Sequence, residues 1–155
     1  MPKKTVLTLV LITKDNQILL GLKKRGFGVG KTNGFGGKLE VGESIEEAAR
    51  REVFEECSLE IKSLEPVAII DFSWQDKDQD LEMHVFHCDN FSGLVEESEE
   101  MKPKWFDLDN IPYKKMWNDA QYWFPVFLEN KKFEADFLLG KKDQVIKHNI
   151  KTKTL

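Results

Sequence analysis

Apolar and polar positions along the chain follow a pattern that predicts β-strands interrupted by two helices. The β-rich apolar runs Thr5–Ile12 and Gln17–Leu22 flank the polar turn Lys14-Asp15-Asn16, which predicts a β-hairpin. Later runs predict further strands at Val67–Trp74, Leu81–His87, Lys104–Phe106, Phe133–Leu139 and Val145–Ile150. A cationic stretch with several glycines, residues 23–37, is expected to form a loop after the hairpin.

Helical spacing of apolar residues occurs twice. The first helix is expected over Ser44–Cys57, because Ser44 and Glu47 form a capping box in front of an apolar seam. The seam consists of Ile45, Ala49 and Val53, and the charges expected to support the helix at four-residue intervals are Glu47, Arg51 and Glu55. The second helix is expected over Asp119–Glu129, with Pro125 tolerated as a bend.

The order of these elements favours one domain over residues 1–155. The chain has no internal repeat, low-complexity tract or linker. Strands broken by two well-separated helices are typical of an α+β or mixed α/β domain with helices on a curved sheet. The chain has 155 residues, of which 41% are hydrophobic, and this is enough for a packed core.

Composition excludes several classes of protein. The formal net charge of −4 argues against broad binding to long nucleic acids or anionic membranes, although a local cationic pocket or bound metal still allows a nucleotide. No stretch approaches the ~20 apolar residues that span a bilayer, and no hydrophobic signal segment follows Met1. Cys57 and Cys88 are expected to be reduced thiols, as in a cytoplasmic protein.

Three carboxylates gather on the first expected helix. Glu52, Glu55 and Glu56 are three and four residues apart, so they project from neighbouring faces. Their like charges repel one another and raise one another's pKa unless a cation lies between them. Mg²⁺ prefers hard oxygen ligands and bridges carboxylates to substrate phosphates. For such a segment in isolation, a solvated acidic surface is the alternative.

The segment around these carboxylates, GGKLEVGESIEEAARREVFEECSL at residues 36–59, resembles the sequence box of the Nudix hydrolase family. The box positions matched within residues 37–59 are Gly37, Glu43, Arg51, Glu52, Val53, Glu55, Glu56 and Leu59. Ser58 replaces the family's glycine, which serves a left-handed turn after the helix. The resemblance implies the Nudix fold, a curved mixed sheet flanked by two helices. It also implies Mg²⁺-dependent hydrolysis of a nucleoside diphosphate linkage, with Mn²⁺ as the alternative cation.

The resemblance further implies roles for individual residues. Glu52 and Glu56 would be the main metal ligands. The assisting ligands would be Glu55, the carbonyl of Gly36, and Glu100 from a neighbouring loop. Arg51 would orient the glutamates and Glu43 would brace the loop. The implied chemistry is attack of a water molecule on phosphorus, which releases a nucleoside monophosphate and a phosphate-containing leaving group.

Similarity extends over nearly the whole chain to the animal MutT-homologue enzymes, which hydrolyse oxidised purine nucleoside triphosphates. The matching segments are KKRGFG at 23–28, NGFGGK at 33–38, HVF at 84–86, ESEEMKPKWF at 97–106, IPYKKMW at 111–117 and YWFP at 122–125. The substrate-binding residues implied by this resemblance are Thr8, Lys23, Phe27, Asn33, Phe72, Trp117 and Asp119. Their chemistry suits a purine, because aromatic rings stack on a base with ~1–3 kcal/mol while amide and carboxylate groups read its edge.

Two departures from these relatives bear on the base. The relatives carry two adjacent aspartates where this chain has Asp119-Ala120, and Thr32 replaces a tryptophan beside Asn33. A single carboxylate still accepts hydrogen bonds from a guanine-like edge, but the shared protonation of two acids is lost. We therefore expect hydrolysis of 8-oxo-dGTP-like triphosphates, with 2-oxo-dATP-like substrates second, to monophosphate and pyrophosphate. The base preference is expected to be altered or narrowed.

Other interpretations stay open at this point. Phe72 and Trp74 are equally compatible with core positions, Asn33 with a turn, and Lys23 with an edge strand. The alternative functions are Nudix hydrolysis of ADP-ribose, a dinucleoside polyphosphate or a capped RNA end, and an inert nucleotide-sensing module. We expect a monomer that binds a small nucleotide, located in the cytoplasm with mitochondrial or nuclear fractions as alternatives.

Overall fold

The computed structural model describes residues 3–153, so the ends of the expected 1–155 domain lie outside the described residues. The long strands are β1 (Lys3–Lys14), β2 (Gln17–Lys23), β5 (Glu65–Trp74), β6 (Gln79–Cys88), β8 (Met101–Asp107), β9 (Lys132–Leu139) and β10 (Val145–Lys153). The short strands are β3 (Thr32–Asn33), β4 (Glu60–Ile61) and β7 (Phe91–Ser92). The helices are α1 (Ile45–Cys57) and α2 (Ala120–Leu128), with 3₁₀ turns η1 (Tyr113–Lys115) and η2 (Lys141–Asp143).

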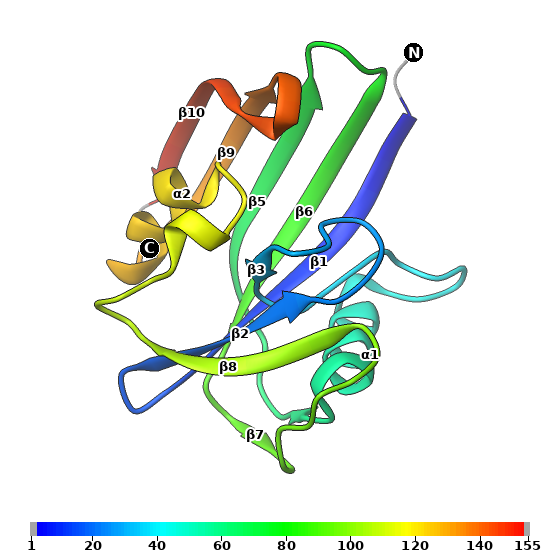
Figure 1. Cartoon of the computed structure of the whole chain (residues 1–155), viewed down its shortest axis with the longest axis vertical. Helices are drawn as coiled ribbons and strands as arrows, with labels where there is room; N and C mark the ends of the chain where they lie inside the picture. The colour runs from blue at the N-terminus through cyan, green and yellow to red at the C-terminus, as the bar shows by residue number, and fades with distance from the viewer. Residues whose placement is uncertain (1–2, 154–155) are drawn as a thin grey trace.

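One twisted mixed sheet organises the molecule (Figure 1). Its strand order is β10-β9-β5-β6-β1-β2-β3, and β8 pairs with β2 on the far side of the hairpin. β1 runs parallel to β6 and β5 runs parallel to β9, whereas the other paired neighbours are antiparallel. The expected α+β class, a mixed sheet with two helices in a single domain, is confirmed.

The expected hairpin of β1 and β2 forms, and its short pairing leaves an edge of β1 to the glycine-rich segment of the site. Asp15 and Asn16 have φ angles of 51° and 63°, as a tight two-residue hairpin turn requires. Pairing between the two strands is confined to residues 12–14 of β1, whereas β6 pairs with residues 3–12. The glycine-rich segment after β3 takes the remaining edge of β1, through the bridges Leu7–Lys38 and Val10–Phe35.

Helix α1 begins and ends where its sequence indicates. The Ser44 hydroxyl accepts from the Glu47 N–H at 3.1 Å, and the Glu47 carboxylate accepts from the Ser44 N–H at 3.1 Å. Ser58 ends the helix with φ 67°, the left-handed geometry that the family's glycine serves. Of the two ion pairs expected along the helix, Arg51–Glu55 forms at 3.3 Å. The Glu47–Arg51 pair does not form, because the Glu47 carboxylate accepts from the Ser44 N–H at the helix cap.

The sheet separates two hydrophobic clusters. Helix α2 belongs to the larger cluster, in which Trp123 and Phe124 pack with the strand residue Phe137. Helix α1 packs against the smaller cluster, where its Ala49 and Val53 join strand residues of β1. Pro125 lies within α2 and the helix continues to Leu128, so the expectation that proline is tolerated there holds. No helix in residues 3–153 is long and apolar enough to cross a membrane.

Three short strands escaped prediction. β3, β4 and β7 have two residues each, which is too short for any periodicity to register. β3 pairs with β2 and β4 pairs with β7, and these pairings form only because the fold brings the segments together. Cys57 and Cys88 are both buried free thiols, which agrees with the expectation of reduced cysteines.

Candidate active site

Two glycines bring the β1 edge into contact with helix α1. The Gly36 N–H donates to Glu56 Oε1 at 2.9 Å, and the Thr8 N–H donates to the Gly37 carbonyl at 2.9 Å. A Cβ at position 36 would stand 1.8 Å from the Thr8 carbonyl oxygen, and one at position 37 would stand 2.7 Å from the Glu52 carboxyl carbon. At position 36 only glycine permits this approach, because the clash is with backbone; at position 37 a side chain would displace the Glu52 carboxylate instead.

Glu56 is buried and its neighbour Glu52 is half-buried, and only Glu52 has a cationic side chain paired with it. Glu56 is 3% exposed, and burial together with the charge of Glu52 raises its pKa to about 8. Burial also raises the pKa of Glu52, although the Arg51 guanidinium opposes the shift. A buried carboxyl without a cation beside it favours the protonated form. Both groups offer hard oxygen donors, so their chemistry fits a divalent cation.

Arg51 is the hub that orders the remaining carboxylates of α1. Its Nε and Nη2 donate to the two oxygens of Glu43 at 2.6 and 2.9 Å, and its Nη1 donates to Glu52 at 2.8 Å and to Glu55 at 3.3 Å. The hydrogen bond from Arg51 lowers the pKa of Glu43, and the Glu40 backbone N–H adds to the effect. The guanidinium thus links the loop before the helix to the acidic face.

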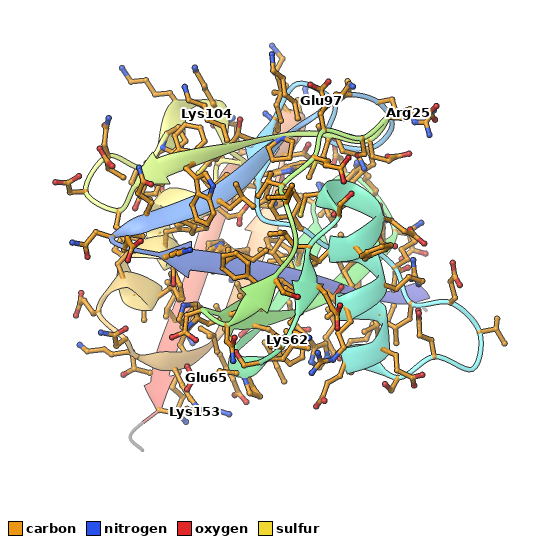
Figure 2. The ribbon with its side chains drawn as sticks, turned by 90° about the horizontal axis from the view of Figure 1, so that it is seen from below. Arg25, Lys62, Glu65, Glu97, Lys104 and Lys153 are labelled. Carbon is orange, nitrogen blue, oxygen red and sulfur yellow. The ribbon has the colours of Figure 1, made fainter. Side chains whose placement is uncertain are left out.

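Glu100 approaches the same site from the loop before β8. Its carboxylate accepts from Lys23 Nζ at 3.1 Å and from Arg25 Nε at 2.9 Å, and these partners lower its pKa. Lys24 and Glu97 pair beside them at 2.6 Å, and Figure 2 shows Arg25 and Glu97 along one edge of the molecule. Two loops remote in sequence are therefore held together by ion pairs at the mouth of the site.

A cleft of about 560 Å³ collects most of these groups. Its polar lining includes Thr8, Lys23, Asn33, Gly36, Gly37, Glu52, Glu55, Glu56 and Glu100. Within residues 3–153, no three or more acidic, histidine or cysteine side chains stand in an arrangement ready to hold a metal ion. Arg51 hydrogen-bonds to Glu52 and Glu55, and Lys23 and Arg25 hydrogen-bond to Glu100.

An aromatic cavity continues from this cleft. It measures about 90 Å³, and Phe27, Asn33 and Trp117 line both spaces. The rings of Phe27 and Trp117 lie 5.1 Å apart at the mouth, where Phe27 is 64% exposed. Deeper in the cavity, Phe72 and Trp74 lie on the same face of β5, so they serve the core and line the cavity together. Flat apolar walls of this kind suit a planar ring system.

Asp119 is the ionisable group of the cavity lining. It is 6% exposed, and its Oδ2 accepts from the Trp123 indole N–H at 2.8 Å. Burial raises the pKa of Asp119 to about 6, against the opposing effect of that hydrogen bond. Ala120 also lines the cavity and is buried, so no second carboxylate stands beside Asp119 in the chain. Asn33 ends strand β3, so the turn alternative is wrong; its Oδ1 accepts from the Gly34 N–H at 2.9 Å and its side chain lines the cavity.

The structure brings all the sequence-predicted residues to this cleft and cavity except Arg51 and Glu43, which hydrogen-bond to each other and, through Arg51, to Glu52 and Glu55. Sequence reasoning missed the lining residues Leu81, Met83, Trp123 and Leu139. The alternation of buried residues along β6 was the available signal for Leu81 and Met83. A larger groove of about 650 Å³ shares only Phe72 and Leu81 with the cavity and none of the acidic helix residues.

The chain belongs to the NUDIX domain family, whose model matches residues 1–127. It is 45% identical over 145 residues to the oxidized purine nucleoside triphosphate hydrolase of Danio rerio, covering 94% of this chain and 93% of that protein. The protein of the same name from Mus musculus is 43% identical over 144 residues, covering 93% and 92%. The family and the expected Nudix fold are therefore confirmed.

A solved structure supports the fold independently of close sequence similarity. The crystal structure of the Mutator MutT protein from Bacillus halodurans matches with a TM-score of 0.84 at 23% identity, covering 94% of this chain and 97% of that one. Nudix hydrolases generally use divalent cations, and the hard oxygen donors described above are compatible with that requirement.

Proposed function

We propose that this chain, acting as one domain over residues 1–155 with its Nudix box at 37–59, hydrolyses oxidised or modified purine nucleoside triphosphates to the monophosphate and pyrophosphate. The observation that carries the proposal is that a cleft lined by Glu52, Glu55, Glu56 and Glu100 shares lining residues with an aromatic cavity that contains Asp119. The Danio rerio and Mus musculus relatives are named for the same class of substrate.

The acidic end would bind the triphosphate. Glu52 and Glu56 would hold a divalent cation, assisted by Glu55, Glu100 and the Gly36 carbonyl. Mg²⁺ is the proposed cation because the donors are hard oxygens and the substrate itself supplies phosphate ligands; Mn²⁺ accepts the same ligands and is the alternative. When bound, the cation supplies charge stabilisation at phosphorus and makes an attacking water more acidic.

The protein groups around the acidic end have separate tasks. Arg51 and Glu43 would keep the carboxylates oriented. Lys23, now paired with Glu100 at 3.1 Å, would meet the phosphates, and Thr8 would line the passage to the base. On substrate binding, Lys23 would exchange Glu100 for a phosphate, and Glu100 would exchange Lys23 for the cation. Each charge would then keep a partner of opposite sign.

The aromatic end would select the base. Phe27, Trp117 and Phe72 would enclose the purine ring, while Asn33 and Asp119 would meet its hydrogen-bonding edge. Above its pKa of about 6, Asp119 is a carboxylate and accepts from the N–H groups of a guanine-like edge. Ala120 supplies no second acid, so the preference is expected to be narrower than that of a two-aspartate pocket.

Steady-state kinetics on 8-oxo-dGTP, 2-oxo-dATP and unmodified purine triphosphates with Mg²⁺ test the proposal. We expect the 8-oxo-dGTP reaction to have the highest kcat/KM and to yield pyrophosphate, and Glu56→Gln to lose ~10²-fold or more of the rate. Ala120→Asp should raise kcat/KM for 2-oxo-dATP relative to kcat/KM for 8-oxo-dGTP. If no purine triphosphate is cleaved while ADP-ribose or a dinucleoside polyphosphate is, the substrate class is wrong. If nothing is cleaved while calorimetry shows that a purine triphosphate binds, the chain is an inert nucleotide-binding module.

We also propose that the protein works as a monomer on small nucleotides in the cytoplasm. The net charge of −4 and the two buried free thiols support this proposal. Light scattering after size-exclusion chromatography tests the oligomeric state, and a stable dimer mass would reject it. Fractionation of cells that produce the protein tests the compartment.

A further inference from the structure

A cationic recess lies beside the candidate active site. It measures about 310 Å³, and Lys31 and Trp117 belong both to its lining and to the lining of the cleft. Trp117 also lines the aromatic cavity. The other walls come from the segments around η1, the start of α2 and η2. The described lining contains none of the glutamates of α1, so the recess is separate from the acidic end of the cleft.

The lining of this recess carries an excess of positive charge. Lys31, Lys114 of η1 and Lys142 of η2 line it from three segments that are remote in sequence. Asp143 is the single acid among the described lining residues, and its Oδ1 accepts from the Trp74 indole N–H at 2.7 Å. Three lysines against one aspartate give a formal charge of +2, in a chain whose net charge is −4. One lysine is an ordinary surface residue, whereas this local excess attracts an anion.

The three ammonium groups of the recess are not neutralised by carboxylates of the protein. At the cleft, Lys23 pairs with Glu100 at 3.1 Å. No salt bridge within residues 3–153 involves Lys31, Lys114 or Lys142. Their charges therefore remain available to a ligand, and a charge-assisted hydrogen bond is stronger than a neutral one.

Hydrogen bonds fix the walls of the recess and leave a neutral donor in it. The Asn118 Oδ1 accepts from the Val145 N–H at 2.8 Å, which joins the segment before α2 to the start of β10. Because this oxygen is occupied, the amide nitrogen of Asn118 remains as a donor in the lining. Lys142 has a φ of 56°, a left-handed conformation that is unfavourable for a residue with a Cβ. The surrounding turn therefore holds Lys142 in its position at the recess.

We propose that this recess is an anion subsite that takes a phosphate group, with Lys31, Lys114 and Lys142 as charged donors and the Asn118 amide as a neutral one. A phosphate ester carries about −1.5 to −2 charges near neutral pH, which matches the charge of the lining, and its oxygens accept from several donors at once. The group has two possible sources: inorganic phosphate, and a second phosphate on a nucleotide whose base lies in the aromatic cavity. The second source rests on the proposed function, because Trp117 and Lys31 connect the recess to that site.

Two double variants with the same change in net charge test the proposal. Lys114→Gln/Lys142→Gln removes two lysines of the recess. Lys115→Gln/Lys141→Gln is the matched control, because it removes their exposed chain neighbours, which do not belong to the lining. A difference between the two variants therefore reports on the recess and not on the overall charge of the protein.

Inorganic phosphate is titrated into isotope-labelled protein in chelator, at an ionic strength kept constant with chloride, and followed by NMR. The side-chain amide of Asn118 and the indole N–H of Trp117 report on the recess, whereas the Gly36 N–H reports on the acidic end of the cleft. We expect saturable shifts of the first two signals in the wild type and in the control variant.

In Lys114→Gln/Lys142→Gln the apparent Kd for phosphate should rise ~5-fold or more, since one exposed ion pair contributes up to roughly a factor of five. Equal weakening in both double variants, shifts confined to Gly36, or no saturable shift would overturn the proposal. Spectra without phosphate check that each variant is folded. If the double variant is not, the pair Lys114→Gln and Lys115→Gln replaces it with the same expectation.

Two nucleotides distinguish the sources of the phosphate. Deoxyguanosine 5′-monophosphate is compared with the same nucleotide carrying a second phosphate on its 3′ hydroxyl. If the subsite takes that group, the bisphosphate binds the wild type more tightly, and only Lys114→Gln/Lys142→Gln loses the advantage. If the subsite takes free phosphate, the two nucleotides bind alike and inorganic phosphate still saturates the recess beside the monophosphate. Failure of both nucleotides to bind would reject the proposed function, while the phosphate titration alone decides on the subsite.

Discussion

Replacement of Glu56 by glutamine should change how the stability of the metal-free protein depends on pH. Glu56 is 3% exposed, and burial with the Glu52 charge raises its pKa from 4.5 to about 8. Between these two pH values the folded protein keeps a proton that the unfolded chain has lost. The contribution of Glu56 to stability is therefore most favourable below its pKa in the unfolded chain. It decreases as the pH rises toward its pKa in the folded protein.

The magnitude follows from the pKa difference. Each pH unit in this window costs about 1.4 kcal/mol of unfolding free energy, so Glu56 alone removes at most about 5 kcal/mol by pH ~8. For a domain of this size, a loss of ~1 kcal/mol lowers Tm by roughly 2–4 °C. Glu56→Gln keeps an oxygen for the Gly36 N–H and cannot ionise, so its Tm should lack this component of the decline.

Thermal unfolding in chelator and in Mg²⁺, from about pH 5 to about pH 9, measures the effect. In chelator, the Tm of wild type should fall by roughly 10 °C relative to Glu56→Gln across the window. Mg²⁺ should restore the wild type at high pH more than the variant, because a bound cation favours the ionised carboxylate. The exposed Glu96→Gln is the control and should parallel the wild type. Parallel curves for wild type and Glu56→Gln would show that burial does not retain the proton.

Two backbone positions give further predictions. Ser58→Gly should raise Tm by roughly 1–4 °C at unchanged kcat, because φ 67° is more favourable for glycine; a lower Tm would contradict this account of the helix end. Gly36→Ala should abolish folding or lower Tm far more than Gly30→Ala, since its Cβ would meet the Thr8 carbonyl oxygen at 1.8 Å. A Cβ at Gly30 would meet nothing within 4 Å, so its cost is limited to the strain of its φ of 84°. Equal Tm losses, measured by circular dichroism, would refute the steric argument.

The parts of the structure that were predictable are those encoded locally. Helix α1, its cap at Ser44 and its end at Ser58 follow from neighbouring residues, and so does the approach of the carboxylates on one helix. The long strands follow from their apolar runs, with ends displaced by up to three residues. The expected Glu47–Arg51 pair failed because the cap and the pair compete for the same carboxylate, which spacing alone does not decide.

The parts that escaped prediction depend on contacts between remote segments. The Trp74–Asp143 hydrogen bond joins residues 69 positions apart, and Lys23–Glu100 joins residues 77 apart. Neither residue of the first pair stands out in sequence, because a strand tryptophan and a turn aspartate are ordinary at those positions. Lys23 and Glu100 entered the prediction through family resemblance, and their pairing became visible only in the folded chain.

The two ends of the candidate site are joined by the way β1 changes partners. β1 pairs with β6 along residues 3–12 but with β2 only along residues 12–14. The edge of β1 that faces β2 is therefore not paired with β2 before residue 12. The glycine-rich segment takes that edge through Val10–Phe35 and Leu7–Lys38, and it carries Asn33 to the cavity and Gly36 to Glu56. Successive residues of β1 point to opposite faces of the sheet. Leu7 lines the aromatic cavity and the adjoining cleft, Thr8 contacts the glycine turn at the acidic end, and β1 thereby connects the two ends that the proposed function assigns to the base and the phosphates.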